Sequence, residues 1–394
     1  MVISRIPPTI PPSVILPAVL RDLDPRSRRA LLWSIGDAAL FSVMEGLSAG
    51  SLLLYAIAQG MPTLIVGLLA SFPLFAGSVS QLLSPALERL CGSRKGAVLA
   101  GGLLHALSWG AVPLTGQLDG TAREVALLAV VCAGTVGWFL TLPSWSSWMG
   151  DLVPPRIRAS YFAWRAVLPQ LFSFGGILVM GEWLMRRPGA GPGAFHALFL
   201  MAAGARALSL LCLLFQHEPA VGVFPEEAEL PPEARPGDLG RVTTFFSAFH
   251  FSLFLVAPYF HPYMRVVHMD YRTIAWLTAI SFPAKLLALP FWARAAGRRG
   301  HRWVVLASGT GTALLPCLWI LSADWRYLLA VQILNGFVWA GIELCEIPYL
   351  LQLTRPGERT RRFSGYFAIR SLSGCLGAVA GDGLLLKNAW IQRL

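Results

Sequence analysis

Long apolar runs separated by short polar gaps make up most of the chain. Eleven runs are long enough for a membrane-crossing helix, which needs about 20 mostly apolar residues. They cover residues 30–58, 62–86, 97–116, 125–147, 161–185, 195–216, 242–264, 273–293, 303–322, 326–350 and 364–386. These runs are too continuously apolar for the alternating pattern of membrane β-strands. The sequence therefore predicts an all-α integral membrane protein.

Composition supports this fold class and excludes several functions. Charged residues make up only 13% of the chain, whereas soluble domains have about 25%. The net charge of +11 comes without a basic helix or an aromatic-interleaved patch, so no nucleic-acid partner is expected. The six cysteines form no CxxC pair, and no Walker A, HExxH or GxSxG motif occurs. We expect no cofactor, no metal and no enzymatic activity.

The polar gaps predict the domain organisation and the orientation. Residues 1–29 form a cytoplasmic tail, 30–216 a six-helix bundle, 217–241 a polar, proline-rich cytoplasmic linker, and 242–394 a five-helix bundle. Arg and Lys gather in the gaps that would lie on the same side as the N-terminus. This bias predicts a multi-pass protein of the cell (inner) membrane with its N-terminus in the cytoplasm.

The two halves repeat each other at a constant shift of 205 residues. The shift places Tyr161-Phe162-Ala163 and Arg165 on Tyr366-Phe367-Ala368 and Arg370, and Pro85, Arg89, Gly92 and Arg94 on Pro290, Arg294, Gly297 and Arg299. Two separate segments share this offset without gaps. Because an even number of helices separates the copies, the halves are predicted to be parallel, related by an axis along the membrane normal.

Two segments resemble a known family. The loop PSWSSWMGDLVPPRIRASYFAWR, residues 143–165, is similar to the loop between the fourth and fifth helices of bacterial major facilitator superfamily proteins. The segment ERLCGSRK, residues 88–95, resembles that family's loop between helices two and three, although Ser84 and Glu88 stand where the family has Gly and Asp. The resemblance implies two parallel bundles around a central cavity. The family usually has twelve helices, and residues 387–394 are too few for a twelfth, so we expect it to be lacking.

In the resembled family, charged residues of these loops form contacts that hold the inward gate. Carried over, the gating residues are Glu88, Arg89, Arg94, Asp151, Arg158, Arg165, Arg294, Arg299 and Arg370. Such ion pairs would form in one conformation of a transporter and break in the other. The alternative is that these charges only set the topology and contact lipid headgroups.

Polar side chains inside the apolar runs are the candidates for chemistry, because charges at mid-bilayer are costly and tend to face a cavity or a partner. The resemblance implies that the runs starting at 30, 125, 242 and 326 line the cavity. Their candidate residues are Asp37, Glu45, Trp138, Thr141, Trp145, His250, Asn335, Trp339, Glu343 and Glu346. Asn335, Trp339, Glu343 and Glu346 recur at helical spacing on one face. The alternative is that these residues only form hydrogen bonds between helices.

The resulting hypothesis is a monomeric secondary transporter that moves a small organic solute through the lipid bilayer by alternating access. Proton coupling is expected from the membrane carboxylates, because a carboxyl in a low-dielectric cavity can titrate near neutral pH. The alternative function is a non-transporting sensor or accessory membrane protein on a degenerate transporter scaffold. The sequence does not identify the solute.

Overall fold

The computed structural model of the protein describes residues 20, 23–187, 191–222, 238–256, 260, 264, 267, 269 and 271–386. Most of the predicted tail and linker, and residues 387–394, where the expected lack of a twelfth helix falls, lie outside these residues. Every regular element in the described part is helical, and the all-α prediction is confirmed. Seven of the described helices are long and apolar enough to cross a membrane, judged by length and composition alone.

The amino-terminal half contains six long helices and one short one. They are α2 (Pro25–Ala58), α3 (Thr63–Ser80), α4 (Ser84–Cys91), α5 (Arg94–Thr115), α6 (Gly120–Leu152), α7 (Arg158–Met185) and α8 (Gly193–Phe215). Short 3-10 turns, Gln81–Leu83 and Pro155–Ile157, lead into α4 and α7. The carboxy-terminal half contains α9 (Asp238–Val256), α11 (Tyr271–Arg299), α12 (His301–Leu321), α13 (Trp325–Gln352) and α14 (Arg359–Leu386), with a 3-10 turn at Pro356–Glu358.

Local chemistry moves some helix ends away from the predicted ones. Helix α2 starts at Pro25, before the predicted residue 30, because the Asp24 carboxylate accepts a hydrogen bond from the Ser27 amide at 2.9 Å and proline suits the first turn. Helix α9 starts at Asp238, inside the predicted linker. Helix α4 ends where Gly92 takes a positive φ of 71°, a conformation that favours glycine.

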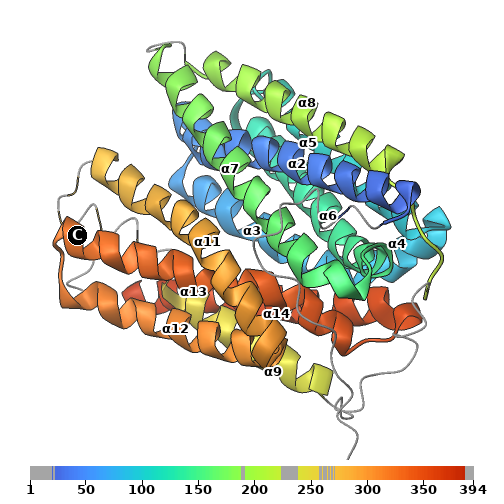
Figure 1. Ribbon diagram of the computed structural model, residues 1–394. Coiled ribbons are helices and arrows are strands. Elements are labelled where there is room, and N and C mark those ends of the chain that lie inside the picture. Colours follow the sequence, from blue (N-terminus) through green and yellow to red (C-terminus); the bar gives the residue numbers. More distant parts are fainter. Residues whose placement is uncertain are drawn as a thin grey trace, which may run out of the picture.

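The helices of the two halves form two groups that lie against each other (Figure 1). In the amino-terminal half, α2 packs on α7 and α8, and α5 packs on α6 and α8. In the carboxy-terminal half, α13 packs on α11 and α12, and α14 packs on α9. Between the halves, α3 meets α14 and α7 meets α11. The 205-residue shift relates α3 to α11 and α7 to α14, so the repeat exchanges the two inter-half contacts, as expected for parallel pseudo-repeats.

The apolar core differs between the two ends of the bundle. We call the end where α5, α7 and α14 begin and α6, α8 and α13 end the arginine-rich end. There one core joins both halves, with Leu31 and Trp148 from one half and Phe246, Leu350 and Phe363 from the other. Toward the opposite end, the described residues form two separate cores. One lies in the amino-terminal half around Tyr55 and Phe199, and the other in the carboxy-terminal half around Leu315 and Trp319. The halves are therefore joined most tightly at the arginine-rich end.

Candidate functional site

The first buried charge cluster lies within the amino-terminal half, around Asp37 of α2. Its carboxylate accepts a hydrogen bond from Ser209 at 2.7 Å and forms ion pairs with Arg165 of α7 at 3.3 Å and Arg206 of α8 at 3.7 Å. Arg206 also donates to Ser209 at 2.7 Å. Two arginines thus share one acid inside the bundle, and the cluster ties α2 to α7 and α8.

Arg165, predicted as a gating residue, belongs to this cluster. The sequence grouped it with the gating loops, but it lies two turns inside α7, where it binds Asp37 and donates to Ser34 at 3.1 Å. Its guanidinium group sits 4.1 Å from the centre of the Trp145 ring of α6, a favourable cation–π contact. Trp145 and Asp37 thus meet through Arg165, although the sequence placed them on separate helices of the predicted cavity.

Arg370 of α14 is the repeat equivalent of Arg165, and it too lies inside a long helix, three turns after the start of α14. It forms an ion pair with Glu346 of α13, whose carboxylate also accepts a hydrogen bond from Tyr366 at 2.8 Å. Both arginines therefore bind one carboxylate, but the acid comes from α2 in one half and from α13 in the other. The repeat preserves the cation and moves its anion to a helix that is not equivalent.

Glu343 lies one turn before Glu346 and belongs to a different cluster. It accepts hydrogen bonds from Lys285 of α11 at 2.7 Å and from the Trp339 indole. Lys285 and Glu343 line a small recess of about 10 Å³ together with Gln170 of α7, which belongs to the other half. The side chains of Lys285 and Glu343 are 15% and 30% exposed, so this pair is more accessible than the Asp37 cluster and borders the interface between the halves.

Glu45 of α2 is exposed and has no ion pair with any described residue. Its direction follows from helix geometry. Leu54, nine residues further on, is 47% exposed on the apolar outer surface, and nine steps of about 100° place it half a turn from Glu45. Gly46, next to Glu45, packs against Gly176 of α7. Glu45 therefore lies on the side of α2 opposite the exposed Leu54.

The remaining predicted cavity residues lie in less open surroundings. Thr141 is buried and lies so close to α5 that a Cβ added to Gly101 would be 2.7 Å from its methyl group. In this conformation the Thr141 side chain packs against α5, and its place in a cavity stays a prediction. Trp138 packs on Phe41 and on His105 of the same half. His250 bonds to the Phe246 carbonyl at 2.8 Å, and Asn335 donates to Gln332 at 3.0 Å.

Asp151, at the end of α6, connects the two halves. One carboxylate oxygen pairs with Arg94 at the start of α5, in the same half, and the other pairs at 2.8 Å with Arg359 at the start of α14, in the other half. The exposed fractions of Arg94, Asp151 and Arg359 are 3%, 1% and 0%. Removing one member of such a buried triad destabilises the folded protein by several kcal/mol, because a charge is left unpaired.

Some of the other charged residues at this end have partners near the triad, and some form no ion pair with a described residue. Glu218, after α8, binds Arg94 at 3.0 Å, and Arg158 donates to the carbonyls of Gly150 and Val153. Glu88 accepts a hydrogen bond from Ser144 at 3.3 Å. By contrast, three predicted gating arginines form no ion pair with a described residue and are exposed at this end: Arg89, Arg294 and Arg299. Arg299 instead lies 4.4 Å from the Trp303 ring centre.

Sequence reasoning missed three partners that complete these clusters. Arg206 had a usable signal, because an arginine within the apolar run 195–216 needs a buried acid, and Asp37 is that acid. Lys285 had the same signal, but from the sequence it could either neutralise an acid across the cavity or extend to the membrane interface. Arg359 had none, because nothing in the loop after residue 353 distinguishes it from Arg355, Arg361 and Arg362, which are exposed.

Comparisons with known proteins agree with this architecture. A model of the Major Facilitator Superfamily matches residues 242–392. No curated protein matches the sequence significantly. The human organic anion transporter MFSD10 (TETRAN) has a similar fold, with a TM-score of 0.65 and 16% identity over 93% of this chain and 96% of that chain.

Two bacterial structures show the same likeness. The proton:xylose symporter XylE of E. coli gives a TM-score of 0.68 at 13% identity, over 93% of this chain and 90% of that chain. A bacterial homologue of the iron transporter ferroportin, in an outward-facing state, gives 0.65 at 16% identity, over 92% of each chain. These likenesses establish the fold, and the predicted parallel pseudo-repeats are confirmed.

Members of this superfamily are transporters and not enzymes, which agrees with the prediction that the chain is not an enzyme. The family match over the carboxy-terminal half and the fold shared by more than nine-tenths of the chain lead to the same assignment. The protein is a multi-pass membrane protein with the fold of the major facilitator superfamily, and residues 242–392 match that family's model.

Proposed function

We propose that the protein is a secondary transporter that moves a small organic solute by alternating access. The observation that carries this proposal is the Asp151 triad, in which one carboxylate binds an arginine from each half. These contacts can form only while the halves are together at the arginine-rich end. The separate cores toward the other end support a conformation that opens there. Rocking of the halves would break the triad and open the arginine-rich end.

The solute site in this proposal lies between the halves, at Lys285, Trp339 and Glu343. This cluster borders α7 of the opposite half and is partly exposed. The indole offers a flat apolar surface, and the ion pair offers one donor and one acceptor. A solute with a polar group beside an apolar body could bind here by competing for one member of the pair.

Proton coupling in this proposal is assigned to Glu45. The acids Asp37, Glu343 and Glu346 are each paired with a described cation, so releasing them to bind a proton costs an ion pair. Glu45 has no such pair among the described residues and lies on the side of α2 opposite the exposed Leu54. Glu45 can therefore take up a proton without breaking an ion pair to a described residue.

The arginine-rich end is assigned to the cytoplasm, because most of the loop cations lie there and cytoplasmic loops retain Arg and Lys. This places the N-terminus inside the cell, and the inner membrane is the expected location. Both halves of the proposed site come from one chain, so a monomer suffices for transport.

Transport and coupling can be tested together in proteoliposomes that contain the pH dye pyranine. A panel of radiolabelled sugars, amino acids and organic anions is added outside, and uptake and internal pH are recorded against protein-free liposomes. We expect uptake of at least one solute, with internal acidification in the wild type but not in Glu45→Gln. Uptake without acidification would remove the proton coupling alone. Absence of uptake across the panel would favour the non-transporting scaffold.

A further inference from the structure

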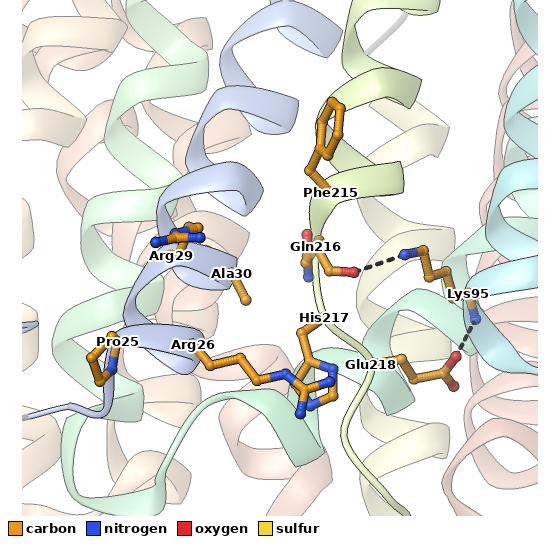
Figure 2. A pocket seen from close by; sticks show the side chains of 9 residues that line it. All are labelled: Pro25, Arg26, Arg29, Ala30, Lys95, Phe215, Gln216, His217 and Glu218. Atoms are coloured by element: carbon orange, nitrogen blue, oxygen red, sulfur yellow. Dashed lines mark hydrogen bonds between the residues drawn. The ribbon is translucent and has the colours of Figure 1, made fainter.

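A basic recess lies at the arginine-rich end, outside the central clusters and the Asp151 triad. It has a volume of about 630 Å³ and is drawn in Figure 2. The start of α2, the start of α5 and the segment after α8 enclose it, with lining residues Pro25, Arg26, Arg29, Ala30, Lys95, Phe215, Gln216, His217 and Glu218. The recess lies at the level where α2 begins and α8 ends, which is where these two helices would leave the membrane.

The charge of the recess is positive. Arg26 and Arg29 are exposed and form no ion pair with a described residue. The Lys95 ammonium group binds the carbonyls of Leu214 and Gln216, at 2.6 and 3.0 Å. The one lining carboxylate, Glu218, is already held by Arg94 and by the backbone amide of Lys95. Among the lining residues, side-chain cations therefore outnumber the available negative charge.

Two polar residues of the recess, His217 and Gln216, indicate which kind of ligand would fit it. Burial lowers the pKa of His217, and the neighbouring charges of Arg26 and Lys95 lower it further, as expected where positive charge accumulates. Gln216 is fully buried, and its side-chain oxygen has no hydrogen-bond partner among the described residues. A buried amide oxygen without a partner costs free energy, which a ligand with a hydroxyl donor would recover.

An apolar groove continues from the recess along the outer surface of the bundle. It lies between α5 and α8, has a volume of about 940 Å³, and extends from Leu99 to Leu114 on α5. At 1.5 Å per residue this is about 22 Å, longer than the roughly 15 Å of one leaflet's hydrocarbon. The groove and the recess meet at Lys95, whose ammonium group binds the carbonyl of Leu214, a residue that lines the groove.

We infer that the recess and groove together bind one anionic phospholipid with a hydroxylated headgroup. The phosphate contacts Arg26, Arg29 and Lys95, a headgroup hydroxyl donates to Gln216, and an acyl chain lies in the groove between α5 and α8. Charge complementarity selects the phosphate, and the continuous polar and apolar surfaces select a lipid over a free anion. This site is independent of the proposed transport function.

The test uses the full-length protein in detergent and phosphatidylglycerol as the probe, with bound lipid counted by native mass spectrometry. We expect one tightly retained phosphatidylglycerol, and none with phosphatidylcholine. Arg26→Gln together with Arg29→Gln should weaken binding by about 10- to 30-fold, since each surface cation contributes about 1 kcal/mol toward an anionic lipid. Arg298→Gln with Arg302→Gln removes equal charge from exposed positions at the same end and should leave binding unchanged.

Two further arms separate a lipid site from an anion site. Gly204 lines the groove and has open space around it, so Gly204→Leu fills the groove and should reduce phosphatidylglycerol binding several-fold. Inorganic phosphate at the same concentration should not displace the lipid. The inference is overturned if phosphate displaces it, if Gly204→Leu has no effect, or if both arginine pairs weaken binding equally.

Discussion

Arg165, Arg206 and Arg370 lie within long helices and each bind a carboxylate, and the local geometry decides which one. Arg370 contacts Glu346, and the hydroxyl of Tyr366 shares the same acid. An isolated charge in such a site would cost several kcal/mol. The ion pair therefore allows both charged groups to be buried. Removing one partner should leave the other charge unpaired, whereas removing both should not.

A double-mutant cycle at this pair should show strong coupling. Glu346→Gln and Arg370→Gln should each lower the free energy of unfolding by about 3–5 kcal/mol, because each leaves the other charge unpaired. The double variant should lose clearly less than the sum of the two. Unfolding in detergent with a chemical denaturant measures these values. Additive losses would mean that the contact carries no interaction energy.

His217 gives a pH prediction outside the membrane helices. Burial lowers its pKa below the ordinary value of 6.5, with Arg26 and Lys95 acting in the same direction. The folded protein therefore favours neutral imidazole, and this contribution to stability is complete above pH 6.5 and is lost as the pH falls below it. Arg26→Gln should raise the pKa toward 6.5. Histidine NMR of labelled protein measures both values, and a wild-type pKa at or above 6.5 would contradict the argument.

At this scale the sequence predicted which residues are charged and buried but not how they pair. Glu343 and Glu346 share a helix face, yet they bind cations from two different helices. Asp37 was recognised as an unusual membrane acid, but its partners come from positions 128 and 169 residues away. Pairing depends on tertiary contacts, and one sequence carries no record of them.

At the scale of elements, close helix packing depends on individual glycines. Helices α2 and α7 approach each other at Gly46 and Gly176, where an added Cβ on Gly176 would lie 3.0 Å from the Gly46 Cα. Backbone atoms cannot move aside as a flexible side chain can. The neighbouring Gly175 has nothing within 4 Å of such a Cβ, so the chain supplies its own control.

Gly176→Ala should destabilise the protein by about 1–3 kcal/mol through overpacking. Gly175→Ala should be neutral or stabilising by up to about 1 kcal/mol, because alanine has the higher helix propensity. Thermal unfolding in detergent compares the two directly. Equal effects of both substitutions would show that the packing of α2 on α7 is looser than the structure indicates.

The existence and order of the helices could be predicted from the sequence because lipid leaves few alternatives to a helix. Their ends were less certain. Helix α11 continues from Tyr271 to Arg299, beyond the predicted residue 293, since a helix can extend past the membrane surface with its charged residues in water. The apolar pattern of the sequence predicts only the part of a helix that lies in lipid, and not the full length of the helix.

At the scale of the whole molecule, the account depends on a difference between the two ends. Both halves share one core and the Asp151 triad at the arginine-rich end, whereas their cores are separate toward the other end. The sequence predicted two parallel halves because its repeat keeps one register. It could not predict which end is closed, since that depends on contacts such as Arg359 with Asp151.

The most direct test measures distances between the halves at both ends. Spin labels at positions 90 and 298 report on the arginine-rich end, and labels at 118 and 320 report on the opposite end, in a variant whose native cysteines are replaced. All four positions are exposed. Asp151→Asn removes the charge that binds both Arg94 and Arg359. Glu182→Gln, in an exposed pair with Arg186, serves as the control.

In pulsed electron paramagnetic resonance of the protein in nanodiscs, Asp151→Asn should add a population with a longer 90–298 distance and a shorter 118–320 distance. The control should match the unsubstituted protein. If Asp151→Asn leaves both distance distributions unchanged, the triad does not hold the halves together, and the proposed alternating-access gate is wrong.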